Sequence, residues 1–194
     1  MIRSMKHLAL LAALAVPAAL TAQDRWSVDV GAGAAFATQD LGDADLSTGV
    51  VFEGTLAYRL MPHLWVYGGW DWLHFQATNS FAGADVDFEE TGYAYGLRFE
   101  HPLRAGSDAA FRLRAGGTYD HIEVESADGA VSVDSGHGIG WEVGAGLAVP
   151  LSDTWRLVPG VRYRALTRDI GVGAVTTEVD LTYVTIDLGV SRTF

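Results

Sequence analysis

The sequence predicts an all-β protein, an eight-stranded antiparallel up-and-down β-barrel preceded by a cleavable signal peptide. Three observations support this fold class. An apolar run follows basic residues at the N-terminus, hydrophobicity then alternates with a period of two, and short and long connections alternate between the alternating segments. The composition also excludes some classes. A net charge of −11 leaves no basic stripe for nucleic acid, and the lack of cysteine excludes a disulfide framework.

The first 22 residues have the features of a secretory signal. Two basic residues and a histidine precede the apolar run 8–20, which has the length of a signal-peptide core and is too short to span a bilayer stably. Small residues offer a cleavage site after Ala22 and a second after Ala18. We therefore expect a signal peptide over 1–22 and a barrel domain over 23–194, with an N-terminal anchor as the alternative.

The rest of the chain consists of eight alternating segments, and none of it repeats apolar residues with helical spacing over three turns. The predicted strands cover residues 26–36, 50–60, 64–75, 92–100, 111–120, 139–149, 155–164 and 183–194. The third segment is ambiguous, because Trp65 and Tyr67 compete with Val66, Trp70 and Trp72 for the same face.

The connections predict the topology. Short links with Pro62, Pro102 and Pro150 follow the second, fourth and sixth segments. The longer tracts that follow the other segments cover residues 38–48, 76–90, 126–136 and 167–178. This order indicates a meander with every long loop at one end and both termini at the short-turn end.

The charged residues assign the two faces to environments. The polar face is rich in glycine, which leaves room for arginines in a narrow lumen, and its opposite charges are spread over different strands. We therefore predict a lumen charge network of Asp29, Glu53, Arg98, Glu100, Arg112, Arg114, Asp120, Glu142, Arg162, Arg164 and Asp187. A soluble, lipocalin-like barrel with the apolar face inside is the competing fold.

Aromatic residues of the apolar face gather near the strand ends, as expected at two water–lipid interfaces. The predicted girdles are Trp26, Tyr58, Phe99, Phe111, Trp155 and Phe194 toward the short turns, and Phe36, Phe52, Tyr93, Tyr119, Trp141 and Tyr163 toward the long loops. About ten residues tilted by roughly 45° span the ~25 Å apolar band of an outer membrane. A sheet in lipid must close, and eight strands are enough.

Residues 23–194 resemble the small outer-membrane β-barrel superfamily of Gram-negative-type bacteria, with its OmpA-like, OmpX-like, OmpW-like and opacity-protein barrels. In that family a terminal Phe, with a polar residue and a Gly before it, is the signal read by the barrel assembly machinery. Asp187, Gly189 and Phe194 occupy these places, whereas Arg192 stands where an apolar or aromatic residue is usual. The resemblance implies an outer-membrane monomer whose partners are membrane lipid, lipopolysaccharide and the assembly machinery.

The expected function follows from the narrow interior. Side chains fill an eight-stranded barrel, so a wide pore is disfavoured and the lumen charges should form a plug. We expect a structural, adhesive or ligand-interaction role without a cofactor, and a narrow channel for small polar or hydrophobic solutes is the alternative.

An enzyme is the third possibility, because some barrels of this size modify lipid A with a serine, a histidine and a carboxylate near the outer rim. The candidates are Ser135, His137 and Glu142, or His121 with Glu123 and Ser126. Neither set has the His-x-Ser order of the deacylases, and Glu142 and His137 fall on opposite faces of their segment. We therefore predict no catalytic site.

The long tracts are acidic, which predicts a negatively charged outer face. Their carboxylates are Asp40, Asp43, Asp45, Asp85, Asp87, Glu89, Glu90, Glu123, Glu125, Asp128 and Asp134. Plain solvation explains them, but they could also hold divalent cations against lipopolysaccharide or face a cationic partner. The mildly apolar Phe81, Ile170, Val172 and Val175 could serve a small hydrophobic ligand or adhesion.

Overall fold

The computed structural model describes residues 25–39, 44–80, 82–126, 130–172 and 175–194, so the predicted signal peptide lies outside it. Nine strands make up the described chain: β1 (Trp26–Ala37), β2 (Gly49–Met61), β3 (Leu64–Ser80), β4 (Gly83–Pro102), β5 (Ala110–Glu125), β6 (Val131–Asp134), β7 (Gly138–Pro150), β8 (Trp155–Val172) and β9 (Val175–Thr193). Within these ranges no helix is long and apolar enough to cross a membrane.

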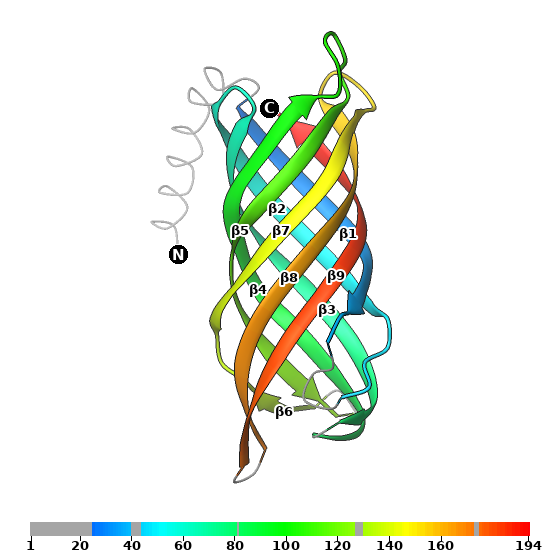
Figure 1. Ribbon diagram of the computed structural model, residues 1–194, viewed down its shortest axis with the longest axis vertical. Helices are drawn as coiled ribbons and strands as arrows, with labels where there is room; N and C mark the ends of the chain where they lie inside the picture. Colours follow the sequence, from blue (N-terminus) through cyan, green and yellow to red (C-terminus); the bar gives the residue numbers. More distant parts are fainter. Residues whose placement is uncertain (1–24, 40–43, 81, 127–129, 173–174) are drawn as a thin grey trace, which may run out of the picture.

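Eight of the strands close into a barrel. Each pairs antiparallel with its neighbour in chain order, except that β5 pairs with β7 past the short β6. The ring closes between β1 and β9, from Ser27 opposite Thr193 to Ala37 opposite Tyr183. Figure 1 shows the tilted strands around a long, narrow cylinder. The predicted eight-stranded up-and-down barrel is therefore confirmed.

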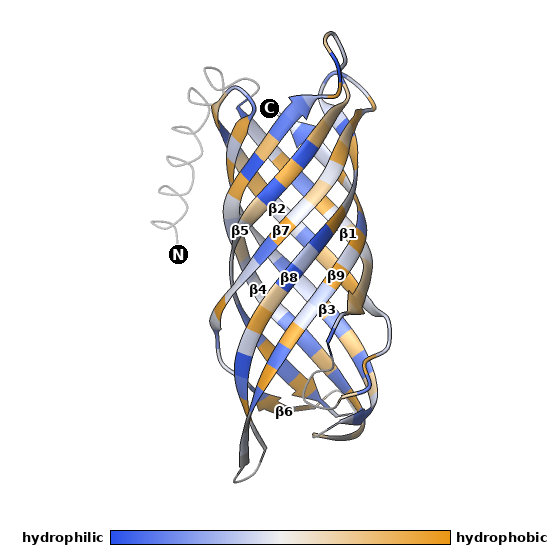
Figure 2. Ribbon diagram, in the orientation of Figure 1, coloured by the Kyte–Doolittle hydropathy of each residue, from blue (hydrophilic) through white to orange (hydrophobic). Residues whose placement is uncertain are grey.

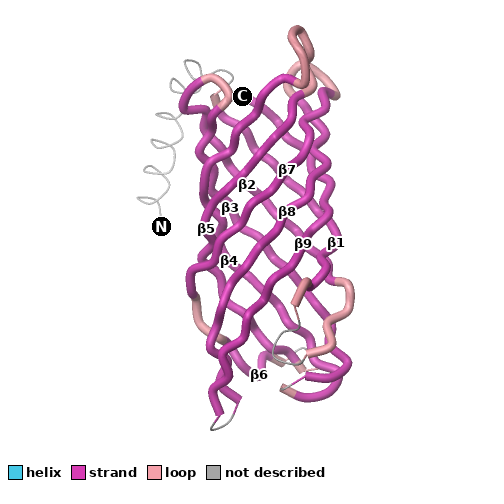
Figure 3. Tube along the Cα trace, in the orientation of Figure 1, coloured by secondary structure: helices cyan, strands magenta, loops and turns pink. Residues whose placement is uncertain are grey.

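The connections lie as the sequence predicts at one end and differ at the other. Turns at 62–63, 103–109 and 151–154 lie at the same end of the barrel as the C-terminus, as Figures 1 and 3 show. The predicted long loops 76–90 and 167–178 are wrong, because most of their residues extend β3, β4, β8 and β9. Part of the tract 126–136 forms β6, which adds to the edge of β5.

The extensions form because the alternation of the strands continues into these tracts and each hairpin partner supplies the ladder hydrogen bonds. Gln76 stands opposite Asp87, and Arg168 stands opposite Val179. We call the part of the barrel that these extensions build, beyond the outer aromatic residues, the outer zone. The remainder of the barrel, as far as the short turns, is the inner zone.

In the inner zone the apolar face looks outward. Trp141, Val143 and Leu147 are 50%, 44% and 40% exposed, whereas Arg112 and Arg162 are buried inside the barrel. Figure 2 shows the resulting alternation of hydrophobic and hydrophilic residues along the strands. An exterior of large apolar side chains around a charged interior is the reverse of a soluble barrel and suits contact with lipid.

In the outer zone the two faces exchange character. Its interior is an apolar core that includes Val51, Leu73, Phe75, Ala77, Val86, Phe88, Ile122, Val124, Leu166, Ile170, Val179, Leu181 and Tyr183. Its exterior carries polar residues such as Gln76, Asp169 and Asp180. Ile170, expected on a loop for ligand entry, is instead fully buried in this core.

Candidate functional site

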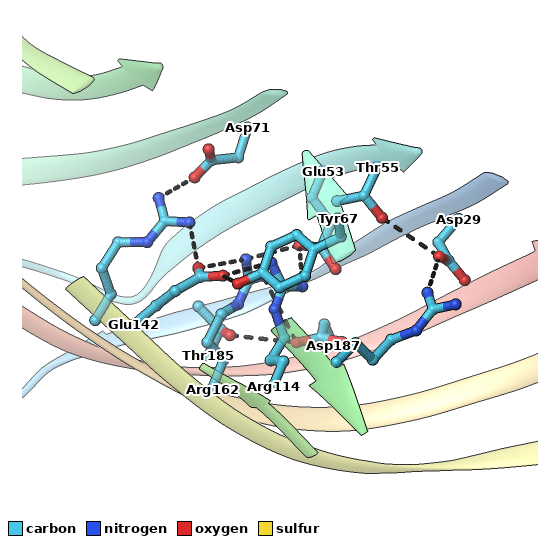
Figure 4. A network of polar contacts seen from close by, with 12 residues as sticks. Asp29, Glu53, Thr55, Tyr67, Asp71, Arg114, Glu142, Arg162, Thr185 and Asp187 are labelled. Carbon is cyan, nitrogen blue, oxygen red and sulfur yellow. Dashed lines mark hydrogen bonds and ion pairs between the residues drawn. The ribbon is translucent and has the colours of Figure 1, made fainter. Parts of the chain in front are cut away.

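The interior of the inner zone is filled by a network of arginines and carboxylates, drawn in part in Figure 4. Nearest the short turns, Asp29 of β1 binds two arginines. Its oxygens lie 2.6 Å from Arg98 Nη1 and 3.0 Å from Arg112 Nη1. Glu100 binds the same two arginines, with its Oε1 3.0 Å from Arg98 Nε and 2.7 Å from Arg112 Nη2. Three strands are thereby linked across the lumen.

Arg114 of β5 links the next layer. Its Nη1 lies 3.0 Å from Glu53 Oε2 and its Nη2 lies 2.5 Å from Glu142 Oε1. Arg162 of β8 approaches the same two carboxylates, at 2.7 Å from Glu53 and 3.5 Å from Glu142. Asp187 lies further off, 3.9 Å from Arg162, and accepts a hydrogen bond from Thr185.

Arg164 of β8 forms the layer below the apolar core. It binds Asp71, lies 2.9 Å from Glu90 Oε1 and lies 2.8 Å from Glu142 Oε2. The hydroxyl of Tyr67 donates to Glu142 at 2.7 Å, so this glutamate accepts from three different strands. The Glu142 side chain has no solvent exposure. Burial of such charges is tolerated only because each one is paired and hydrogen-bonded.

Arg168 of β8 lies farthest from the short turns among the arginines of the network. It binds the Asp120 carboxylate and donates to the carbonyl oxygens of Asp120, Gly138, Ile139 and Thr167. Both Arg168 and Asp120 are buried. This pair ties β5, β7 and β8 together where the charged interior meets the apolar core.

All eleven residues of the predicted lumen network face inward. Eight of them are buried, and the side chains of Glu53, Arg114 and Asp187 are only 12–15% exposed. The network also contains four buried residues that the sequence did not predict for it, Tyr67, Asp71, Glu90 and Arg168. Two of these, Glu90 and Arg168, sit in the predicted loops 76–90 and 167–178, although continuing the alternation of their strands would have placed both inside.

The ambiguous third segment is resolved by the interior. Trp65 and Tyr67 point inward, whereas Val66 and Trp70 are exposed outside. The Arg98 guanidinium lies 4.7 Å from the Trp65 ring and that of Arg114 lies 4.5 Å from the Tyr67 ring, so both rings make cation–π contacts.

Glycines give the Tyr67 ring its space. A Cβ built at Gly96 would lie 2.8 Å from the Tyr67 hydroxyl, and one at Gly116 would lie 2.5 Å from it. Real side-chain carbons do not approach so closely, so glycine is needed at both positions. Room for large polar side chains is the role that the sequence predicts for glycines on the polar face.

Little free volume is left inside. A cavity of about 50 Å³ lies among Glu53, Arg114, Arg162 and Asp187, enough for a few water molecules. Above the network, the Phe75 and Tyr183 rings meet edge to face at 6.0 Å, and Phe88, Ile122 and Leu181 are at most 1% exposed. The described interior is therefore closed twice, by charge pairs and by apolar packing.

The predicted girdle residues lie on the outer wall. Trp26, Phe36, Phe52, Tyr93, Phe99, Tyr119, Trp141, Trp155 and Phe194 are 37–57% exposed, and Tyr58, Phe111 and Tyr163 are half-buried against neighbours. Several contact each other across strands, as Trp26 and Tyr58 do at 4.8 Å and Trp141 and Tyr163 do at 5.4 Å.

The predicted assembly signal lies at the closure of the barrel. The Phe194 N–H donates to the Trp26 carbonyl at 2.8 Å, and the ring of Phe194 is exposed outside. Asp187 points inward and Gly189 lies opposite Gly31 of β1. Arg192, the departure from the family pattern, places its guanidinium 4.7 Å from the Phe194 ring and 5.3 Å from the Trp155 ring.

The structure separates the first set of catalytic candidates. Glu142 is held by lumen arginines, whereas the exposed His137 stacks on His121 at 4.4 Å on the outer wall. The Ser135 hydroxyl donates to the Gly136 carbonyl and accepts from the Ile122 N–H. In the second set, His121 lies 3.9 Å from Glu123, while the Ser126 backbone N–H donates to the Ala130 carbonyl oxygen at 3.0 Å.

The acidic residues of the outer end are distributed differently from the prediction. Glu90 points into the lumen, because the tract that contains it is a strand. Asp85, Asp87, Glu89, Glu123 and Glu125 lie on β4 and β5, and Asp134 lies on β6. Val172 and Val175 lie at the tips of β8 and β9, and Asp40, Asp43, Phe81 and Asp128 fall outside the described residues.

The family model described as outer membrane protein beta-barrel domain matches residues 7–194. The chain belongs to this family. Its members are outer-membrane proteins, which implies the same location for this one. The result confirms the resemblance seen in the last strand and in the alternation of the whole barrel.

Solved structures with the same fold include three bacterial proteins. Neisserial surface protein A matches with a TM-score of 0.64 and 18% identity over 87% of this chain and 97% of that chain. OprG of Pseudomonas aeruginosa gives 0.59 and 15% over 89% and 97%, and Ail, the attachment invasion locus protein of Yersinia pestis, gives 0.54 and 17% over 89% and 99%. No curated protein matches the sequence.

Proposed function

We propose that this protein is a monomeric, non-conducting outer-membrane barrel that acts through its extracellular rim. The observation that carries the proposal is the double closure of the interior, with the Arg164 layer of charge pairs below and the apolar core around Phe75 and Phe88 above. A solute would have to break buried charge pairs and then cross a packed apolar layer, each at a large energetic cost.

The rim itself supports an interaction role with a cationic surface or with cations. Outward-facing carboxylates at this end include Asp87, Glu89, Glu123, Glu125, Asp134, Asp169 and Asp180. Within the described residues, each arginine lies either inside the barrel or toward the short-turn end, so none offsets this charge from outside. Ail was solved with a heparin analogue, a polyanion, which an acidic rim would repel.

The proposal includes export and assembly. Residues 1–22 serve as a cleavable signal peptide, and Asp187, Gly189 and Phe194 serve as the signal for the barrel assembly machinery. The outward aromatic residues then lie at the two interfaces, in contact with lipid below and lipopolysaccharide above. A non-enzymatic role is favoured by the separation of Glu142 from His137, which lie on opposite sides of the barrel wall.

Electrical recording tests the closed lumen. The purified barrel, shown to be folded by its heat-modifiable gel mobility, is inserted into a planar lipid bilayer beside a general porin as a positive control. We expect no unit conductance steps from this protein at voltages where the porin conducts. Stable, reproducible unit currents would contradict the plug and favour the narrow channel.

A further inference from the structure

A mixed cluster of histidine and carboxylate side chains lies on the outer wall of the barrel, above the outer aromatic residues. His121 and Glu123 share the outward face of β5, and Asp134 of β6 stands opposite Glu123. Each residue offers one ligand atom, and these three atoms lie within 4.8 Å of one another. His121 Nδ1 is 3.0 Å from Asp134 Oδ1 and 3.9 Å from Glu123 Oε1.

These spacings fit a tetrahedral transition-metal ion. Zinc binds imidazole nitrogen and carboxylate oxygen at about 2.0–2.2 Å, which places neighbouring ligand atoms roughly 3.3 Å apart. The observed separations lie on either side of that value, so small side-chain rotations would bring all three atoms to a common centre. An imidazole in the set favours zinc or a similar ion over calcium and magnesium, which take oxygen ligands.

The backbone around the cluster holds the ligands in place. Asp134 Oδ1 also accepts the N–H of Gly136 at 2.8 Å, and Gly136 has a φ of 69°, which favours glycine. On the other side, the His137 ring stacks on the His121 ring at 11° and limits its rotation. Partners that orient metal ligands in this way strengthen binding.

A second observation points to a cation at the same place. Glu123 stands directly opposite Glu89 of β4, and Glu125 stands directly opposite Asp87. Carboxylate oxygens of Glu89, Glu123 and Glu125 also lie within 4.8 Å of one another. Like charges directly opposed on antiparallel strands are destabilising. A divalent ion beside Glu123 would offset this repulsion.

We propose that His121, Glu123 and Asp134 form a binding site for a divalent transition-metal ion, zinc being the best fit. The site would tie β6 to the barrel wall through β5. It is separate from the closed lumen and does not depend on whether the barrel conducts.

Calorimetric titration with zinc chloride tests the site. The mature barrel is refolded in detergent, purified with a tag that contains no histidine, and freed of metal with a chelator. We expect one saturable zinc site, and a loss of affinity of at least tenfold in His121→Ala and in Asp134→Asn. The matched control is His101→Ala, because His101 is also an exposed histidine of β4 but lies near the short turns, where its ring stacks on Phe111 at 5.7 Å. Its affinity should stay within twofold of wild type.

Two further measurements can overturn the proposal. His137→Phe preserves the stacking on His121 without a ligand nitrogen, and should bind zinc within threefold of wild type. A tenfold loss in this variant would mean that the ligand set is wrong. Equal binding by wild type and His121→Ala, or displacement of zinc by equimolar magnesium, would reduce the cluster to an unspecific acidic surface. Gel mobility confirms that each variant is folded.

Discussion

Replacing Glu142 by glutamine should lower the free energy of unfolding by about 3–5 kcal/mol, the range for removing one partner of a buried ion pair. The side chain has no solvent exposure and accepts from Tyr67 at 2.7 Å, Arg114 at 2.5 Å and Arg164 at 2.8 Å. Glutamine keeps the size and one acceptor oxygen, but its NH₂ group must face an arginine donor. The loss of one charge-assisted hydrogen bond alone costs about 1.5–3 kcal/mol.

Urea unfolding in detergent micelles or lipid vesicles, followed by tryptophan fluorescence, measures this cost. The six tryptophans of the chain all belong to the barrel, so the signal reports on its unfolding. Glu178→Gln is the matched control, because it removes the same charge from an exposed position on β9. Substitutions at such positions change stability by less than about 0.5 kcal/mol.

A small effect at Glu142 would refute the reasoning. If Glu142→Gln lost less than about 1 kcal/mol, the lumen charges would behave as solvated surface pairs. Water would then have to reach the layer of Arg114 and Arg164, and the closed interior on which the proposed function rests would be wrong.

Two other predictions test the packing and the boundary between the zones. Val30 lies on the outward face of β1 and is 62% exposed, so Val30→Arg should cost about 2–4 kcal/mol if that face meets lipid. Gln76→Arg in the outer zone should cost less than about 0.5 kcal/mol in the same vesicle unfolding assay, and equal costs would contradict the boundary between the zones. Gly116→Val should lower the free energy of unfolding by at least about 1–3 kcal/mol, because its Cβ would lie 2.1 Å from the Tyr95 carbonyl oxygen and 2.5 Å from the Tyr67 hydroxyl. Gly54→Ala should be nearly neutral, because a Cβ there has nothing within 4 Å, and similar effects at both positions would show that the interior can rearrange.

The ring of strands and the direction of its faces could be predicted from the sequence because a period of two fixes both. All eleven predicted lumen charges face inward, and both described ends of the chain meet where Trp26 bonds to Phe194. Every strand of this zone except β3 carries a clear contrast between its two faces. That contrast assigns the two faces even when the neighbouring strands are not known.

The third strand shows where this reasoning fails. Trp65 and Tyr67 are apolar by composition but face the lumen, because their rings cover the Arg98 and Arg114 guanidinium groups. Val66 and Trp70 are equally apolar and face outward. Hydropathy alone does not distinguish the two pairs, since the deciding contacts come from arginines on β4 and β5, far away in the sequence.

The predicted loops failed for a different reason. Val86, Phe88 and Ile170 have the parity of lumen residues but are apolar, so the contrast between polar and apolar faces that marks the predicted strands ends before them. The alternation in fact continues, but apolar residues now face the interior and polar residues face outward, because the environment outside the barrel changes from lipid to water. Polar residues on the outward face, such as Gln76 and Asp180, mark this change.

The two fold interpretations that compete in the sequence therefore apply at different heights of one barrel. Up to the girdle residues Tyr93 and Tyr119, the wall is apolar outside and charged inside, as a lipid-facing barrel requires. Beyond them, β3, β4, β8 and β9, with the outer ends of β2 and β5, form a water-facing wall whose interior packs like that of a soluble protein. Ile122 and Val124 of β5 pack into this core, and His121 and Glu123, which alternate with them, face outward. The point at which hydropathy alternation reverses along a strand thus locates both the membrane surface and the part of the wall that is available for binding.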